Sequence, residues 1–146
     1  MRPYRTRLSL HLRHPTRDLS RVCEILELTP RYIWKKGDER QTPKGNKIVG
    51  IRDSSYCTIE VGPESRKALG ERLREVLKLL QPHEGIFREL AAAGGAVSLY
   101  VGWLCDDSTG EMLDAQLLEE IAKLRMGLEL NIYMPDTSDL ERADEP

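Results

Sequence analysis

The sequence has few aromatic residues, few cysteines and no long apolar run. Aromatic residues make up 5% of its 146 residues, with a single phenylalanine. Cys23, Cys57 and Cys105 are odd in number and widely spaced, which excludes a disulfide framework and a Cys-x-x-Cys metal or redox motif. We expect these three cysteines to be reduced and packed in the interior.

The sequence also lacks a membrane-spanning segment. No run approaches the roughly 20 apolar residues that cross a bilayer. The Arg-rich segment 1–14 lacks the apolar stretch of a signal peptide. We therefore expect a cytoplasmic protein that does not contact membranes.

The composition predicts one globular domain. Hydrophobic residues make up 40% and charged residues 32% of the chain, which excludes collagen, coiled-coil arrays and general disorder. A chain of about 150 residues buries about 68–70% of its unfolded surface, enough for a core without disulfides or metal. We expect residues 1–135 to form a single domain and the acidic residues 136–146 to be a disordered tail.

Charge is distributed unevenly along the chain. Residues 1–52 carry 13 Lys and Arg against 5 Asp and Glu, net +8, whereas residues 53–146 carry 9 against 19, net −10. Such an asymmetry can attract an anionic partner to one end of a molecule. It cancels if the two segments lie on neighbouring strands, and we favour this second interpretation.

Several segments have the pattern of strands. Apolar and polar residues alternate in residues 4–14, 56–61, 97–103 and 128–134, which is typical of strands with one buried face. The aromatic stretch 32–34 favours a further strand. The twenty residues 35–54 are too long for a structureless loop in a compact domain. We expect an irregular strand or hairpin there, with a mobile tip near residues 43–47.

Three apolar stripes at helical spacing lie in residues 19–26, 69–90 and 117–124. Asp18 and Asp114 are placed to cap the first and third helices. Pro63 suits the first position of the second helix, and Pro82 interrupts that helix or divides it into a pair. The resulting order is strand, helix, strand, strand, long helix, strand, helix, strand.

This order predicts an α+β fold. Because each strand is apolar on one face, we expect a mainly antiparallel sheet of four to five strands with helices on one face. A ferredoxin-like βαββαβ core with an added helix and strand fits the order best.

Several landmarks together resemble a known family. They are the Leu-x-Leu strand with its His14-Pro15 break, the helix end at 26–30, Trp34-Lys35-Lys36-Gly37, Leu80-Gln81-Pro82-His83, Gly102-Trp103 and the strand at 128–133. Their order and spacing over residues 5–134 resemble the uncharacterised bacterial family called domain of unknown function 4279. The resemblance implies a small bacterial α+β domain without an assigned activity. Cys57 stands where members of the family often have an aromatic residue, and the segment 41–53 has no counterpart in the family pattern.

The sheet face turned away from the helices is the first candidate for function. We expect it to be open and to show Arg7, Ser9, His11, Thr58, Glu60, Ser98, Tyr100, Asn131 and Tyr133. Because Tyr and Arg are enriched at interfaces, the face is a candidate contact surface for a protein partner or a second copy. A simply solvated face explains the pattern about as well. Nucleic acid is not expected, because residues 56–60 lack an RNP1 motif and Glu60 repels phosphate.

The sequence contains no catalytic, cofactor or metal signature, so we expect a non-enzymatic module. His11 and His14 lie three positions apart on one strand, so their side chains point to opposite faces and cannot share a metal. The acidic loop 106–111 lacks an EF-hand frame, and residues 44–47 lack the spacing of a phosphate loop. The alternative hypothesis is a small-ligand binder or enzyme that uses a pocket between Trp34, Trp103 and the loop 35–54.

Overall fold

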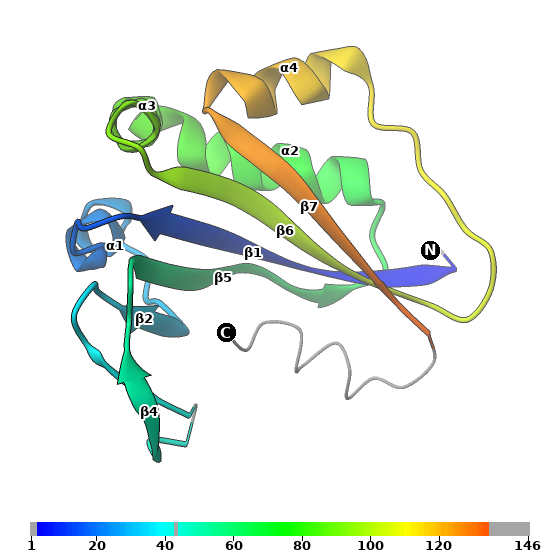
Figure 1. Ribbon diagram of the computed structural model, residues 1–146. Helices are drawn as coiled ribbons and strands as arrows, with labels where there is room; N and C mark the ends of the chain where they lie inside the picture. Colours follow the sequence, from blue (N-terminus) through cyan, green and yellow to red (C-terminus); the bar gives the residue numbers. More distant parts are fainter. Residues whose placement is uncertain (1–2, 43, 135–146) are drawn as a thin grey trace.

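The computed structural model describes residues 3–42 and 44–134, and it consists of one five-stranded sheet, a small hairpin and helices on one side of the sheet (Figure 1). The expected acidic tail at 136–146 and the loop residue Pro43 lie outside the described residues. The elements in chain order are β1 (Tyr4–His14), α1 (Ser20–Leu26), β2 (Tyr32–Trp34), β3 (Glu39–Gln41), β4 (Lys47–Ile51), β5 (Ser55–Ser65), α2 (Leu69–Leu80), α3 (Glu84–Ala92), β6 (Ala96–Cys105), α4 (Ala115–Lys123) and β7 (Met126–Tyr133).

The sheet is mostly antiparallel, as predicted. Its strand order is β2-β5-β1-β6-β7, so the first strand lies at the centre. β1 pairs antiparallel with β5 and β6, and β2 pairs antiparallel with β5. Among the strands of the described residues, only β6 and β7 are parallel, and α4 connects them. The α+β class is therefore confirmed, whereas the finer ferredoxin-like assignment stays an interpretation of this strand order.

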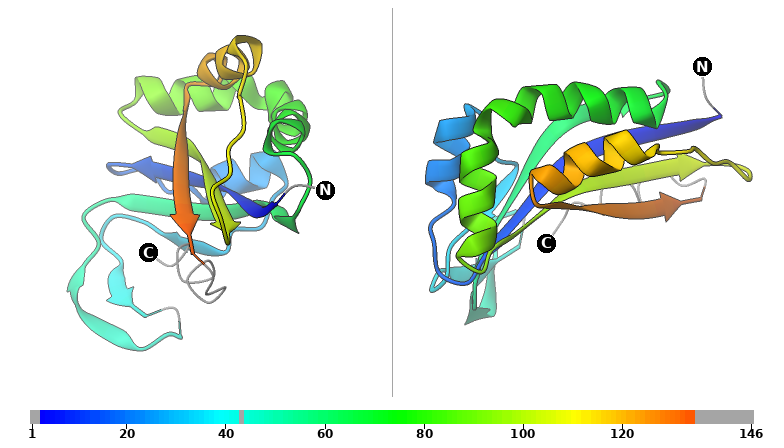
Figure 2. Two further views of the ribbon diagram at one scale, coloured as in Figure 1. Left: turned by 90° about the vertical axis from the view of Figure 1, so that its right-hand side faces the viewer. Right: turned by 90° about the horizontal axis from the view of Figure 1, so that it is seen from above.

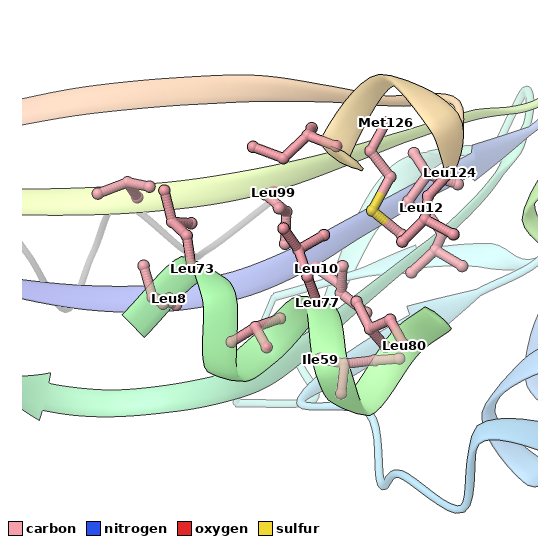
Figure 3. Packing of buried hydrophobic residues seen from close by; sticks show 14 of the residues in the cluster. Leu8, Leu10, Leu12, Ile59, Leu73, Leu77, Leu80, Leu99, Leu124 and Met126 are labelled. Atoms are coloured by element: carbon pink, nitrogen blue, oxygen red, sulfur yellow. The ribbon is translucent and has the colours of Figure 1, made fainter. Parts of the chain in front are cut away.

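The main core lies between the sheet and the helices. Leu8, Leu10 and Leu12 alternate along β1 toward the helices and are 0–1% exposed. The helix α2 lays Leu73 and Leu77 over them, in the packing shown in Figure 3. Seen from above, α2, α3 and α4 cover this face of the sheet (Figure 2). Removal of these side chains from water is the main stabilising contribution to such a layer.

The second predicted helix begins later than the sequence pattern indicates. We expected it to start at Pro63, but β5 continues to Ser65 and α2 begins at Leu69. The ladder between β1 and β5 shifts register at Leu8, opposite Gly62, and then continues to Ser65. Proline is tolerated at such bulges and strand ends, where its missing N–H costs no ladder bond.

Two other helix predictions are confirmed. The second helical region is divided into α2 and α3 by a 3₁₀ turn, Gln81–His83, which contains Pro82. The Asp114 side chain caps α4 by accepting a hydrogen bond from the backbone N–H of Leu117 at 2.9 Å. The prediction that Asp18 caps the first helix is wrong, because the N-cap residue of α1 is Leu19 and no side chain caps the helix. The Asp18 carboxylate accepts a bond from the backbone N–H of Ser20 at 3.0 Å, one residue before that position.

The long segment 35–54 forms the predicted hairpin. β3 and β4 pair antiparallel in a separate two-stranded sheet that projects from the β2 edge (Figure 1). Its apolar side chains are largely in solvent, and Val49 is 94% exposed. No helix within residues 3–42 and 44–134 is long and apolar enough to cross a membrane.

Candidate binding site on the aromatic face

The sheet face opposite the helices carries a row of rings that we call the aromatic face, and it consists of Trp34, Tyr56, His11, Tyr100 and Tyr133. The register explains the row. Odd-numbered residues of β1 point away from the helices, and His11 and Arg13 lie opposite Thr58 and Tyr56 of β5. The row therefore contains one ring from each of the five strands.

The rings contact one another from strand to strand. His11 stacks on Tyr100 with ring centroids 4.6 Å apart, and it meets Tyr56 edge-on at 5.9 Å. Tyr56 lies 4.8 Å from the Trp34 ring on the β2 side. On the β7 side, the hydroxyl oxygens of Tyr100 and Tyr133 are 3.0 Å apart. The aromatic face is thus a packed layer and not a set of separate surface residues.

This packing corrects the prediction of an open face. Thr58 and Ser9 are 0% exposed, Tyr100 is 2% exposed and His11 is 7% exposed, so these four residues are buried. The short polar side chains lie between ring-bearing strands, and Thr58 stands between His11 of β1 and Tyr32 of β2. Thr58, for example, donates its hydroxyl hydrogen to the Tyr56 hydroxyl at 2.6 Å. A partner could not reach the centre of this layer without separating its rings.

Of the rest of the predicted surface, Glu60 is exposed, whereas Arg7, Ser98, Asn131 and Tyr133 are half-buried, and all five make polar contacts. Glu129 of β7 accepts hydrogen bonds from Ser98 at 3.3 Å and from Asn131 at 3.4 Å, and its carboxylate lies 3.6 Å from His11 Nδ1. Arg7 pairs with Glu60 at 3.1 Å. These residues form a polar margin of the aromatic face.

A cavity lies at the Trp34 end of the aromatic face, between β2 and the hairpin. Its volume is about 610 Å³. The lining residues come from both segments: Arg31, Tyr32, Ile33, Trp34, Asp38, Glu39, Gln41, Thr42 and Arg52. The guanidinium of Arg52 lies 3.6 Å over the Trp34 ring, a cation–π contact inside the lining.

The charges of this cavity are unevenly paired. The carboxylate of Asp38 accepts the backbone N–H of Lys35 at 2.9 Å, and that of Glu39 lies 3.5 Å from the Lys47 ammonium across the hairpin. Among the described residues, no carboxylate lies within ion-pair distance of Arg52. Burial, with the charge of Arg40 nearby, lowers the pKa of Arg52. Arg52 is therefore a stacked, half-buried cation whose counterion the described chain does not supply.

The second tryptophan lies elsewhere. Trp103 stacks on Tyr4 at 4.2 Å, on the helix side of the sheet, and its indole N–H donates to Thr109 at 3.1 Å. The predicted pocket shared by Trp34 and Trp103 is thus wrong, because the two rings point to opposite faces. The part of that hypothesis that placed a pocket between Trp34 and the segment 35–54 agrees with the cavity.

No metal site accompanies the cavity. Within residues 3–42 and 44–134, no three His, Cys, Asp or Glu side chains are grouped to hold a metal ion. His11 lies on the aromatic face, whereas His14 Nδ1 accepts the backbone N–H groups of Thr16 at 3.1 Å and Arg17 at 2.9 Å. The prediction that these two histidines point apart is confirmed.

The model of the family described as Domain of unknown function (DUF4279) matches residues 3–135. The chain belongs to this family. The match confirms the resemblance that the landmarks predicted. Comparison with curated proteins and with solved structures gives no match.

Two residues of this site were not singled out in the sequence. Tyr56 occupies an outward position of a predicted strand, and strand parity alone could have added it to the aromatic face. Arg52 comes from the end of the hairpin segment, and only the folded path of that hairpin brings it over Trp34.

Proposed function

We propose that the protein is a non-enzymatic binding module and that the Trp34 cavity binds a small molecule with a flat ring and a carboxylate or phosphate group. The observation that carries the proposal is Arg52, stacked on Trp34 in the lining and without a carboxylate partner among the described residues.

The chemistry of the lining suits such a ligand. A guanidinium that stacks on an aromatic ring keeps its N–H edge available, and that edge matches a carboxylate or phosphate in a bidentate geometry. Tyr32 and Trp34 offer ring surface beside it, and Gln41 and Thr42 offer polar groups that can orient a ligand. The volume lies within the range of about 300–1,000 Å³ that is usual for small-molecule sites.

Titration with matched probes tests this proposal. Benzoate and phenyl phosphate carry the ring and the anion, whereas benzamide carries the ring alone. We expect the two anions to bind and to quench the fluorescence of Trp34, and we expect benzamide to bind at least tenfold more weakly. The variant Trp34→Phe assigns the fluorescence signal.

The variant Arg52→Gln should lower the affinity for benzoate and phenyl phosphate by about tenfold or more, since a charged hydrogen bond contributes about 1.5–3 kcal/mol. Arg88→Gln is the matched control, because Arg88 is exposed on α3 and pairs with Glu84 of the same helix. Equal affinity for benzoate and benzamide, or unchanged affinity in Arg52→Gln, would contradict the proposal.

A second candidate function is self-association through the edge strand β7. Among the described strands, β7 pairs only with β6, so one of its edges is free. Its side chains Leu130 and Ile132 are 49% and 64% exposed. Such apolar edge strands are templates for pairing with another chain. This moves the expected protein contact from the sheet face to the sheet edge, with a second copy of the chain as the partner.

Sedimentation at increasing protein concentration tests the second candidate. We expect a dimer that Ile132→Lys converts to a monomer, because the introduced charge would be buried in the joined edge. Leu79→Lys, at a 52% exposed position of α2, should leave the dimer intact. A wild-type chain that stays monomeric at all concentrations would exclude this candidate without affecting the cavity proposal.

A further inference from the structure

The fold brings together two cysteines that are 34 residues apart in the sequence. The Sγ atoms of Cys23, on α1, and Cys57, on β5, lie 3.3 Å apart. Both are free thiols, and both are buried, with Cys57 0% and Cys23 5% exposed. The third cysteine, Cys105, is also buried but has no sulfur neighbour of this kind among the described residues.

The two sulfur atoms differ in access. Cys23 lines a surface cavity of about 410 Å³ between α1 and β2, together with Glu24, Leu28, Pro30 and Ile33, among others. Cys57 is not part of that lining and lies on the neighbouring strand behind it. A small oxidant that enters the cavity therefore meets the Cys23 sulfur first.

We propose that Cys23 and Cys57 form a redox-active pair in which a peroxide converts the two thiols to a disulfide. The thiolate of Cys23 attacks one peroxide oxygen, the O–O bond breaks, and the leaving oxygen takes a proton to form water (an alcohol if the oxidant is an alkyl peroxide). The resulting sulfenic acid of Cys23 is then attacked by the Cys57 sulfur, which loses its proton as the S–O bond breaks and water leaves. Two thiols lose two electrons in total, and one peroxide is reduced.

The acidities of the two thiols agree with these roles. A hydrogen bond joins the two thiols, and this bond lowers the pKa of Cys23 despite its burial. The same bond, together with burial, raises the pKa of Cys57. Because the thiolate is the nucleophile, Cys23 is the thiol that reacts first and Cys57 is the one that resolves the intermediate.

Oxidation would change the segment that the bond encloses. A disulfide needs an S–S distance of about 2.05 Å, so α1 and β5 must approach by roughly an ångström. The closed loop contains β2, β3 and β4, and with them the Trp34 cavity. The bond would link α1 to β5 at the two ends of this segment and raise the melting temperature by about 5–10 °C, since loop closure restricts the unfolded chain.

Peptide mapping of the native protein tests the proposal. The folded chain is treated with hydrogen peroxide, remaining thiols are alkylated, and trypsin is added. We expect a mass loss of about 2 Da, reversed by dithiothreitol. We also expect a link between tryptic peptides 22–31 and 53–66, which contain Cys23 and Cys57, whereas Cys105 lies in peptide 89–123.

Variants separate the pair from general cysteine oxidation. Cys105→Ala should form the same linked peptides and show the same rise in melting temperature. Cys23→Ala should form no link and show no rise. Oxidation that stops at single cysteines in the native chain, or a link that forms only after denaturant is added, would overturn the proposal. Because the decisive link is measured in the wild-type chain, a variant that fails to fold does not affect the test.

Discussion

The two faces of the central sheet are both buried, but they are built in different ways. On the helix side, Leu10 and its neighbours on β1 pack under α2 in a cluster of buried hydrophobic residues, part of which Figure 3 shows. On the other side, Thr58 is equally buried, yet it lies among rings and hydrogen bonds. Burial of apolar surface is non-directional, whereas stacking and hydrogen bonding require particular partners at particular angles.

The two faces therefore have different roles: the helix side contributes mainly to stability, and the aromatic face contributes mainly to recognition. Full burial of a leucine contributes about 1.5–3 kcal/mol, whereas a typical hydrogen bond contributes about 0.5–1.5 kcal/mol net. The helix side should therefore hold most of the folding free energy. The aromatic face contributes less, but it fixes the position of Trp34 at the cavity through Tyr56.

The largest effect should come from the helix side. Leu10→Ala removes a 0% exposed side chain at the centre of the sheet and should lower the free energy of unfolding by about 3–4 kcal/mol, because a cavity remains. Urea unfolding followed by circular dichroism measures it. Leu118→Ala, at a 46% exposed site of α4, is the control and should change stability by less than about 0.5 kcal/mol. A loss below about 1 kcal/mol in Leu10→Ala would mean that the core is not where stability lies.

A buried charge gives the next effect. Arg72 of α2 is 5% exposed and donates to the Thr6 hydroxyl at 2.7 Å and to the carbonyls of Thr6 and Pro63. Arg72→Leu leaves these acceptors buried and should lower the free energy of unfolding by about 2–3 kcal/mol.

The matched control for Arg72 is Arg74→Leu, two positions along the same helix. Arg74 pairs with Asp114 at 2.8 Å, but both side chains are about half exposed, so the pair contributes less than about 1 kcal/mol. Equal losses in urea unfolding of the two variants would show that the Arg72 contacts add nothing beyond a surface ion pair.

The aromatic face should show a smaller loss. Thr58→Val keeps the shape of the side chain but removes the hydroxyl that bonds Tyr56, so we expect a loss of about 1 kcal/mol in urea unfolding. Thr16→Val, at an exposed position, should have almost no effect. A loss in Thr58→Val as large as that of Leu10→Ala would remove the distinction between the two faces.

Sequence patterns predicted the helix side well for a physical reason. Alternation with period 2 records which residues of a strand face the core, so β1, β5 and β6 and their inward residues followed from the sequence. The strand β7 was also predicted, but its expected buried face is not buried, since Leu130 and Ile132 are 49% and 64% exposed. Alternation does not record what covers the other face. Polar residues such as Thr58 indicate solvent in the sequence, but large rings on adjacent strands can bury them. The burial of these polar residues could therefore be predicted only once the pairing of the strands was known.

The candidate site depended on the same missing information. Trp34 does line a cavity with the segment 35–54, but Trp103 was grouped with it because the sequence gives no distance between two strands. The contacts of Arg52 with Trp34 and of Cys23 with Cys57 each join segments that are far apart in the chain. Such contacts follow from the strand order, which neither spacing nor composition encodes.

The smallest effect at neutral pH concerns His14, at the end of β1. Its Nδ1 accepts hydrogen bonds from two backbone N–H groups, so this nitrogen must carry no proton. Burial, with the charge of Arg17, lowers the pKa of His14 from its ordinary value of 6.5. The unfolded chain therefore takes up this proton at a higher pH than the folded chain, and stability falls as pH decreases from about 7 toward 5.

His14→Asn tests this contribution, because the asparagine oxygen can accept the same backbone bonds without titrating. At pH 8 the His14 ring is neutral in both the folded and the unfolded wild-type chain. We therefore expect the free energy of unfolding, measured with urea, to change by less than about 0.5 kcal/mol at this pH. Between pH 7 and 5 the variant should lose less stability than the wild type. If the two proteins lose stability in parallel over that range, His14 does not resist protonation in the folded state, and the end of β1 is more open to water than its 7% exposure indicates.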